Sequence, residues 1–281
     1  MKIFNNERIP INYKNPTLAI GNFDGVHIGH QKVFQQARKI ANKNKTKFGV
    51  LTFSPLPVMF FNKEVKNFRL SSEDQKIKLF KKNKVDFIIN IKFNKKFSNL
   101  SAENFIKKII YKKINPKFIA VSNNFKFGKN RKGNIALLEK FNSKYNYKLL
   151  NIKPFKSLRQ IVSSTKIRKY LKQGSINLAN KLLSRTWSIE GYVGKGKKIG
   201  RKLGYRTCNM DIKNYVLPKL GIYSVRVSIQ NQKKLYSGVA YLGSRPTFDG
   251  KKVFLETNIF GIKKNLYKKK NNRVFLEIFK K

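Results

Sequence analysis

Apolar residues recur in two different patterns along the chain, and the change falls near residue 184. In the first part, short apolar runs bounded by Gly, Pro or Asn alternate with longer segments whose apolar residues recur every three or four positions. The runs predict buried strands and the segments predict amphipathic helices. Such alternation favours a parallel sheet covered by helices. The expected strands are 18–20, 48–53, 85–93, 117–123 and 147–155, and the expected helices are 28–41, 71–82, 100–114 and 133–145.

Beyond residue 186 the segments are short, several alternate apolar and polar residues, and glycine-rich or lysine-rich turns divide them. This pattern predicts a small antiparallel barrel or sandwich, because no convincing helix separates the strands. The expected strands are 187–193, 221–229, 233–243, 253–261 and 273–279, and a single helix over 167–184 links the two parts. We therefore predict an α/β domain over residues 1–184 and an all-β domain over 185–281.

One stretch of the first part, 17–41, contains candidate chemistry. An apolar strand passes through a turn containing Gly21, Gly25 and Gly29 into a helix, and the two histidines of the chain, His27 and His30, lie where that helix begins. A helix N-terminus offers unpaired N–H groups and the positive end of a dipole, which favours phosphate. The turn also follows the carboxyl end of a strand, where open α/β sheets bind ligands. The pattern predicts a phosphate-handling site.

Composition restricts the class of protein. A hydrophobic content of 41% with 13% aromatics is typical of a globular chain, and no apolar run is long enough to cross a bilayer. The first residues lack the apolar core of a signal peptide, so we expect a cytoplasmic protein without a membrane partner. A single cysteine, Cys208, excludes an internal disulfide and a multi-cysteine metal site.

The net charge of +50 makes nucleic-acid binding an alternative function. The cations are spread along the whole chain and are mostly lysine, whereas base and phosphate recognition favours arginine. We attribute the charge to compositional bias of the coding sequence and expect no specific nucleic-acid partner. The positive field should nevertheless attract ATP and flavin phosphates.

Four motifs in the first domain resemble those of the HxGH nucleotidyltransferases, and of bacterial FAD synthetases in particular. The first is GNFDGVHIGH; the second is LTFSPLPVMFF, with Leu56 where the family has histidine; the third is VSNNFKFGKNRKGN; the fourth is IVSSTKIRKYL. The resemblance implies a Rossmann-like fold that transfers the adenylyl group of ATP to FMN and releases pyrophosphate. The implied catalytic residues are His27, His30 and Arg168, and the implied nucleotide and flavin contacts are Gly21, Asn22, Phe23, Asp24, Gly25, Asn124, Phe127, Gly128, Ser163, Ser164 and Thr165.

The second domain resembles riboflavin kinases, through a glycine-rich loop at 191–209 and the segment FLETNIF. By this resemblance Thr207 and Asn209 hold Mg²⁺ and ATP phosphates, and Glu256 is the base that takes the proton of the riboflavin 5′-hydroxyl. Arg206, Cys208 and Asn258 depart from the family pattern, and the chain ends before the helix that usually follows. The implied ATP contacts in the loop are Gly194, Gly196, Gly200 and Arg201.

The combined prediction is a bifunctional enzyme that makes FMN from riboflavin and then FAD from FMN, with ATP and Mg²⁺ at both sites. Two alternatives stay open. One is a monofunctional FMN adenylyltransferase whose shortened second domain is a weak or inactive kinase. The other is a basic nucleic-acid-binding protein. The oligomeric state is not determined by the sequence.

Overall fold

The computed structural model of the chain describes residues 1–65, 67–157, 160–194, 207–210, 212, 214–229, 234–247, 250–261 and 273–280. Its contacts divide the chain into two compact units. The first unit comprises Met1–Val65 and Lys76–Val162, and the second comprises Lys66–Gln75 and Ser163–Lys281. The domain boundary at residue 184 stays a prediction.

The first unit contains a six-stranded sheet in the order β1-β4-β3-β2-β5-β6, and every neighbouring pair in it is parallel. This confirms the predicted parallel sheet. All four residues of β2 are buried because the strand lies inside the sheet between β3 and β5. The strands are β1 (Lys2–Phe4), β2 (Thr17–Ile20), β3 (Phe48–Ser54), β4 (Phe87–Lys92), β5 (Phe118–Ser122) and β6 (Lys148–Ile152). Three residues were too few for the pattern to predict β1.

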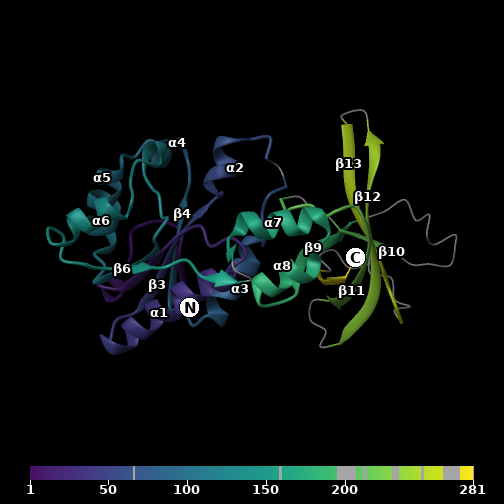
Figure 1. Cartoon of the computed structure of the whole chain (residues 1–281), viewed down its shortest axis with the longest axis horizontal. Coiled ribbons are helices and arrows are strands. Elements are labelled where there is room, and N and C mark those ends of the chain that lie inside the picture. The colour runs from purple at the N-terminus through teal and green to yellow at the C-terminus, as the bar shows by residue number, and fades with distance from the viewer. Residues whose placement is uncertain are drawn as a thin grey trace. The chain divides into compact units, whose positions relative to one another are not determined.

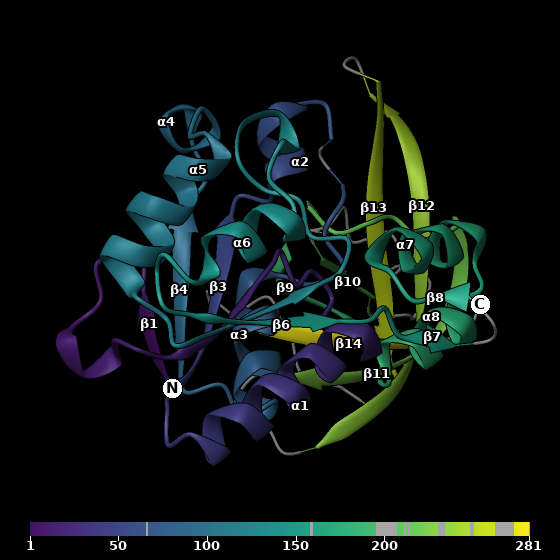
Figure 2. The ribbon, with the colours of Figure 1, turned by 60° about the vertical axis from the view of Figure 1, so that its left-hand side comes forward.

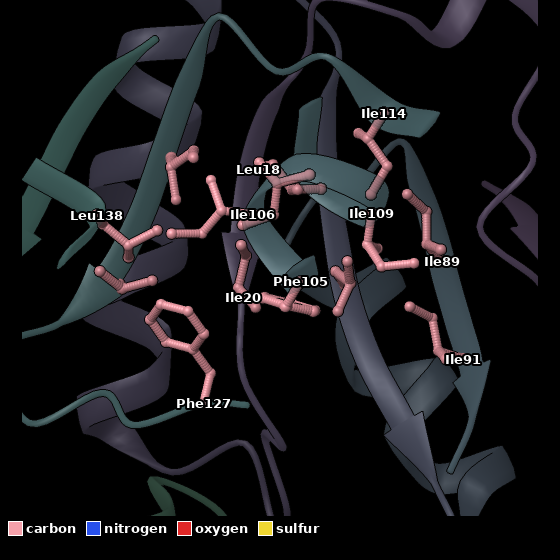
Figure 3. Packing of buried hydrophobic residues seen from close by; sticks show 14 of the residues in the cluster. Leu18, Ile20, Ile89, Ile91, Phe105, Ile106, Ile109, Ile114, Phe127 and Leu138 are labelled. Carbon is pink, nitrogen blue, oxygen red and sulfur yellow. The ribbon is translucent and has the colours of Figure 1, made fainter. Parts of the chain in front are cut away.

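Helices cover both faces of this sheet, and successive strand residues serve opposite faces. On one face α1 (Ile28–Lys43) and α3 (Glu73–Lys82) pack over Val50 and Ile88. On the other face η2 (Phe105–Ile114), a π-helix, and α6 (Ile135–Asn142) pack over Leu18, Ile20 and Ile89, whose side chains point toward the helices in Figure 3. Figure 2 labels α1, α3 and α6 beside the sheet. The shorter helices of this unit are η1 (Ile11–Tyr13), α2 (Pro57–Phe61), α4 (Lys95–Ser98), α5 (Ala102–Asn104) and η3 (Lys129–Arg131).

The predicted helix over 100–114 starts at Ala102, after the cap residue Ser101, and changes to π-helical hydrogen bonding from Phe105 onward. A two-stranded sheet, β7 (Lys156–Ser157) with β8 (Gln160–Ile161), follows β6. Neither feature alters the apolar pattern of the chain, so neither was visible in it.

The second unit contains a closed antiparallel barrel in the order β10-β13-β12-β11-β14-β9, which confirms the predicted barrel. Alternate residues point inward, among them Tyr223, Val225 and Val227 of β11, and all three are buried. The long β12 and β13 form a hairpin (Figure 1). The strands are β9 (Trp187–Gly194), β10 (Thr207–Met210), β11 (Gly221–Ile229), β12 (Leu235–Thr247), β13 (Gly250–Ile259) and β14 (Arg273–Lys280).

The prediction of one helix over 167–184 is wrong. Two helices, α7 (Ser164–Gln173) and α8 (Ile176–Leu183), occupy this stretch. Gly174, at φ 81°, caps the first helix in the left-handed conformation that glycine adopts without strain. The apolar period continues across the break, which explains why periodicity alone did not reveal it.

A segment from the first half of the sequence, Lys66–Gln75, belongs to the second unit. The Trp187 indole donates a hydrogen bond to the Leu70 carbonyl at 2.8 Å, and the Val216 N–H donates to the Arg69 carbonyl at 2.8 Å. The buried Gln75 amide donates to the Ser188 carbonyl at 2.9 Å. These long-range bonds, and not the local sequence, assign the segment to its unit.

Among the described residues, every helix is too short or too polar to span a lipid bilayer.

Candidate active sites

The first candidate site is the turn that joins β2 to α1. It leaves the carboxyl end of β2, the edge at which parallel α/β sheets bind ligands. Phe23 (φ 49°), Gly25 (φ 78°) and Val26 (φ 38°) adopt left-handed backbone conformations. Such conformations are strained in Phe and Val and persist only where the surroundings enforce them, and both side chains are buried.

Both histidines lie at the N-terminus of α1, as predicted. His27 is the N-cap residue, and its Nδ1 accepts the backbone N–H of His30 at 3.3 Å. The two imidazole rings stack, with centroids 3.6 Å apart and planes at 21°. His27 is 5% exposed and His30 is partly buried. The rings are therefore held against the protein at the positive end of the helix dipole, where an anion is stabilised.

Gly29 allows this arrangement. A Cβ atom at this position would lie 3.1 Å from both Cε1 and Nδ1 of His27, closer than ordinary van der Waals contact. The His27 ring therefore occupies the space that any other side chain at position 29 would need. In the sequence Gly29 is one glycine of the turn, and the structure gives it a specific steric role.

The remaining predicted residues of the turn differ in exposure. Phe23 is buried and its ring meets the His30 ring edge-on, with centroids 5.2 Å apart, so it supports the histidine from the core side. Asp24 is 4% exposed, whereas Asn22 is exposed. Gly21 faces the Phe23 ring, which a Cβ atom would approach to 3.0 Å. Asn22 is therefore the member of the turn whose side chain is most accessible to a ligand.

The loop after β5 contains Asn124, Phe127 and Gly128. Asn124 is exposed, and its Oδ1 accepts the Ser122 hydroxyl at 2.8 Å. Phe127 is buried in the core cluster beside η2, where its ring contacts Phe105. Gly128 has φ 71°, and a Cβ atom there would lie 2.6 Å from the Ala102 backbone. Packing accounts for Phe127 and Gly128, and their contact with a cofactor stays a prediction.

The motif Ser163 to Arg168 lies in the second unit. Ser163 caps α7 by accepting the Lys166 N–H at 3.2 Å, and Ser164 and Thr165 follow as the first helical residues. The Arg168 guanidinium stacks on the Phe68 ring at 3.6 Å from its centroid, and its Nε donates to the Phe68 carbonyl at 2.8 Å. Arg168 therefore holds the segment 66–75 in place, a role that the sequence did not predict.

Leu56, which stands where the FAD synthetase motif has histidine, is 2% exposed and precedes α2. An apolar side chain suits this buried position. No imidazole from this motif can take part in chemistry here.

The second candidate site lies on the outer face of the barrel. In β10, Thr207 and Asn209 alternate with the buried Cys208 and Met210, so their side chains point outward. The register places Asn209 directly opposite Glu256 of β13. Directly opposed residues share a face of the sheet. The structure therefore brings together Asn209 and Glu256, with Thr207 two residues away along the same face.

Tyr241 of β12 is the opposite neighbour of Glu256, and 47% of it is exposed. Gly194, at the end of β9, is paired with Asn209. Three predicted ATP contacts, Gly196, Gly200 and Arg201, lie outside the described residues, as does Arg206. Burial raises the pKa of the Cys208 thiol to about 12, which keeps it protonated and unreactive inside the barrel.

A polar cluster beneath the first site was not predicted from the sequence. Lys76 of α3 is 3% exposed and Thr52 of β3 is 1% exposed. The sequence offered one signal, because Lys76 precedes the buried Phe80 by four residues and so shares its helix face. Among 63 Lys and Arg residues that signal was not distinctive.

The described residues contain no group of three or more His, Cys, Asp or Glu side chains that could hold a metal ion. The oxygen donors Thr207 and Asn209 are nevertheless of the kind that Mg²⁺ accepts together with water and substrate phosphates.

Comparison with known proteins finds two enzyme families along the chain. A family model described as FAD synthetase matches residues 10–166, and one described as riboflavin kinase matches residues 183–281. A bifunctional riboflavin kinase/FMN adenylyltransferase of Buchnera aphidicola subsp. Schizaphis graminum is 42% identical, over 91% of this chain and 83% of its own length. The protein of the same name from Escherichia coli (strain K12) is 33% identical, over 89% of this chain and 80% of its own length.

A solved structure also resembles the whole chain. It is described as a macrolide-efflux protein from Streptococcus pneumoniae, and it superimposes with a TM-score of 0.84 at 26% identity, covering 98% of this chain and 88% of that one.

An FAD synthetase domain and a riboflavin kinase domain are thus both present, which confirms the predicted resemblance and makes the chain a transferase with a nucleotidyltransferase part and a kinase part. Sheet, barrel, motifs and relatives agree on one conclusion: the chain belongs to the family of bifunctional riboflavin kinase/FMN adenylyltransferases.

Proposed function

We propose that the barrel phosphorylates riboflavin to FMN with ATP, and that the turn between β2 and α1 adenylylates FMN to FAD with a second ATP. One observation carries the proposal. His27 and His30 are stacked and held at the N-terminus of α1, beyond the carboxyl end of a central parallel strand. This is where a triphosphate is best stabilised.

In the adenylyl transfer, a phosphate oxygen of FMN attacks the α-phosphorus of ATP. A new P–O bond forms, the bond to the β-phosphate oxygen breaks, and pyrophosphate leaves. The protein contributes positioning and charge stabilisation, and no covalent intermediate is needed. Because Nδ1 of His27 accepts the His30 N–H, the neutral His27 ring carries its proton on Nε2. Nε2 of His27 is therefore the atom that donates to a phosphate oxygen as charge develops there.

The other contacts at this site are proposed on the strength of the family motifs. Gly21, Asn22, Asp24 and Gly25 would surround the phosphates. Asn124, Phe127 and Gly128 would border the flavin or nucleotide, together with Phe23. In the second unit, Ser163, Ser164 and Thr165 are proposed as nucleotide contacts by the fourth motif. By the same motifs the Arg168 guanidinium, whose Nε donates to the Phe68 carbonyl, is proposed to contact pyrophosphate.

In the kinase step, Glu256 would accept the proton of the riboflavin 5′-hydroxyl while that oxygen attacks the γ-phosphorus of ATP and ADP leaves. Asn209, opposite Glu256, would orient the reacting groups. Thr207 and Asn209 would hold Mg²⁺, which neutralises phosphate charge when bound. Gly194, Gly196, Gly200 and Arg201 are proposed to contact ATP.

We also propose that the sequence domains meet at residues 184 and 185, and that the protein acts in the cytoplasm, where both reactions find ATP. Its proposed partners are riboflavin, FMN and ATP. Membership of an enzyme family favours catalysis over the alternative of a nucleic-acid-binding module.

Two variants test the assignment. Purified protein is incubated with riboflavin, ATP and Mg²⁺, or with FMN, ATP and Mg²⁺, and the flavins are separated chromatographically. His30→Ala should abolish FAD formation and spare FMN formation, whereas Glu256→Gln should do the reverse. Persistence of FAD in the first variant contradicts the histidine assignment. If the unmodified chain converts FMN to FAD but makes no FMN, the alternative of an inactive kinase domain is correct.

A further inference from the structure

A buried lysine lies beneath the adenylyltransferase turn, and no part of the mechanism above uses it. Lys76 of α3 is 3% exposed, and its Nζ donates a hydrogen bond to the Thr52 hydroxyl at 3.4 Å. Thr52 in turn donates to the backbone carbonyl of Asn22 at 3.2 Å. Asn22 opens the turn that leads to His27. Two hydrogen bonds therefore connect a buried ammonium to the start of the catalytic turn.

Burial of this ammonium needs an explanation. Removing a charged group from water is costly unless it is paired and hydrogen-bonded. Most lysines of the described part of the chain are exposed, and Lys76 is the one among them that is buried. A lysine retained in the interior, on the helix face that contains Phe80, is thus a candidate for a role that an apolar residue could not fill.

The location points to that role. Thr52 lies near the carboxyl end of β3, and its cross-strand neighbour on β4 is Asn90. The Asn90 Oδ1 atom is buried and has no hydrogen-bond partner among the described residues. Polar groups thus gather on the α1 and α3 side of the sheet, at the edge where the turn departs. Elsewhere that side is apolar, with Val50, Ile88 and Phe80 packed together.

The turn above this cluster requires support. Phe23 and Val26 hold left-handed backbone conformations. Conformations of this kind cost about 1–3 kcal/mol each and persist only where contacts fix them. A hydrogen bond to the Asn22 carbonyl fixes the residue at which the turn begins.

We propose that Lys76 is a positioning residue for adenylyl transfer. Through the Thr52 hydroxyl it holds the Asn22 carbonyl, and with it the turn that presents His27 and His30. The proposal rests on the assignment of adenylyl transfer to the histidine turn.

The test compares four variants in both assays. Lys76→Met removes the amino group at similar side-chain length, and Lys76→Arg keeps a charged hydrogen-bond donor. Thr52→Val removes both hydrogen bonds of the Thr52 hydroxyl at similar volume. Lys81→Met, the matched control, replaces an exposed lysine of the same helix by methionine. A misplacement of the catalytic groups by a fraction of an ångström predicts a loss of about tenfold or more in kcat for FAD formation by Lys76→Met.

FMN formation by the same preparations is the internal control, because the barrel does not use Lys76. We expect Lys76→Arg to recover part of the lost kcat, Thr52→Val to lose kcat as Lys76→Met does, and Lys81→Met to match the unmodified chain. The melting temperature of each variant is measured alongside its activity.

Unchanged FAD kinetics in a folded Lys76→Met variant would overturn the proposal. So would a parallel loss of FMN and FAD formation with a lower melting temperature and no rescue by Lys76→Arg, because that result describes a purely structural lysine. If Lys76→Met does not fold, Thr52→Val decides: normal FAD kinetics in that variant reject the relay. The His30→Ala variant distinguishes failure of the histidine assignment from failure of the Lys76 proposal. FAD formation by that variant would refute the histidine assignment, on which the Lys76 proposal rests.

Discussion

Substitution of Gly29 by Ala tests the steric basis of the histidine arrangement. The added Cβ would lie 3.1 Å from Cε1 and Nδ1 of the His27 ring, so the ring must shift by a few tenths of an ångström. That shift disturbs the bond from the His30 N–H to His27 Nδ1, which is already 3.3 Å long. The stacking of the two rings at 3.6 Å changes with it.

Stability and activity should respond differently to this change. Replacing a helical glycine by alanine gains about 0.8–1.0 kcal/mol of helix propensity, and Gly29 lies within α1. Loss of an N-cap hydrogen bond costs about 1 kcal/mol. The two effects nearly cancel, so the free energy of unfolding should change little. Displacement of a catalytic donor by a few tenths of an ångström should lower kcat for FAD formation about tenfold, which corresponds to about 1.4 kcal/mol.

The assay measures FMN-to-FAD turnover together with denaturant unfolding. Gln36→Ala, at an exposed position of the same helix, is the matched control and should leave turnover unchanged. Formation of FMN by Gly29→Ala should also be unchanged. The reasoning is refuted if Gly29→Ala gains the full propensity term in stability and keeps normal FAD turnover, since the ring would then not depend on the missing Cβ.

Three further predictions concern pH, packing and metal. Burial raises the pKa of the Cys208 thiol and the pKa of the Tyr223 hydroxyl, each to about 12. In the unfolded chain the thiol titrates at about 8.5 and the hydroxyl at about 10. As the pH rises, the unfolded state therefore loses these protons first. The free energy of unfolding is highest below about pH 8.5 and falls as the pH rises toward 12. Denaturant midpoints that stay constant from pH 8 to 11 would contradict this expectation. Arg168→Met should lower the free energy of unfolding by about 1–3 kcal/mol, because it removes the hydrogen bond to the Phe68 carbonyl and the stacking on the Phe68 ring. An unchanged urea midpoint would show that neither contact stabilises the fold. Chelation of divalent cations should stop FMN formation, with recovery on addition of Mg²⁺ and weaker recovery in Asn209→Ala; full activity in excess chelator would remove Mg²⁺ from the mechanism.

Local sequence determined much of the first candidate site. The apolar run 18–20, the glycines after it and the helical period beyond them lie within one short stretch, so strand, turn and helix could be predicted from neighbours alone. The spacing of His27 and His30 places them one helical turn apart, which is why one caps the helix and the other lies beside it. The change from helical to alternating periodicity likewise predicted the sheet and the barrel.

Other features depend on which distant segments become neighbours. The opposition of Asn209 and Glu256 follows from strand register, and the membership of 66–75 in the second unit follows from bonds to Trp187 and Val216. The sequence predicted Arg168 as a phosphate ligand, and the structure adds its contact with the Phe68 ring.

The sequence by itself determined the classes of the two folds, the helix start that carries both histidines and the residue types of each site, because hydrophobic period and capping act over a few residues. Tertiary structure alone decided that Lys76 is buried below the turn and that Gly29 makes room for the His27 ring. Burial and steric exclusion depend on atoms that are close in space and distant along the chain, and a linear pattern of apolar and polar residues does not contain those distances.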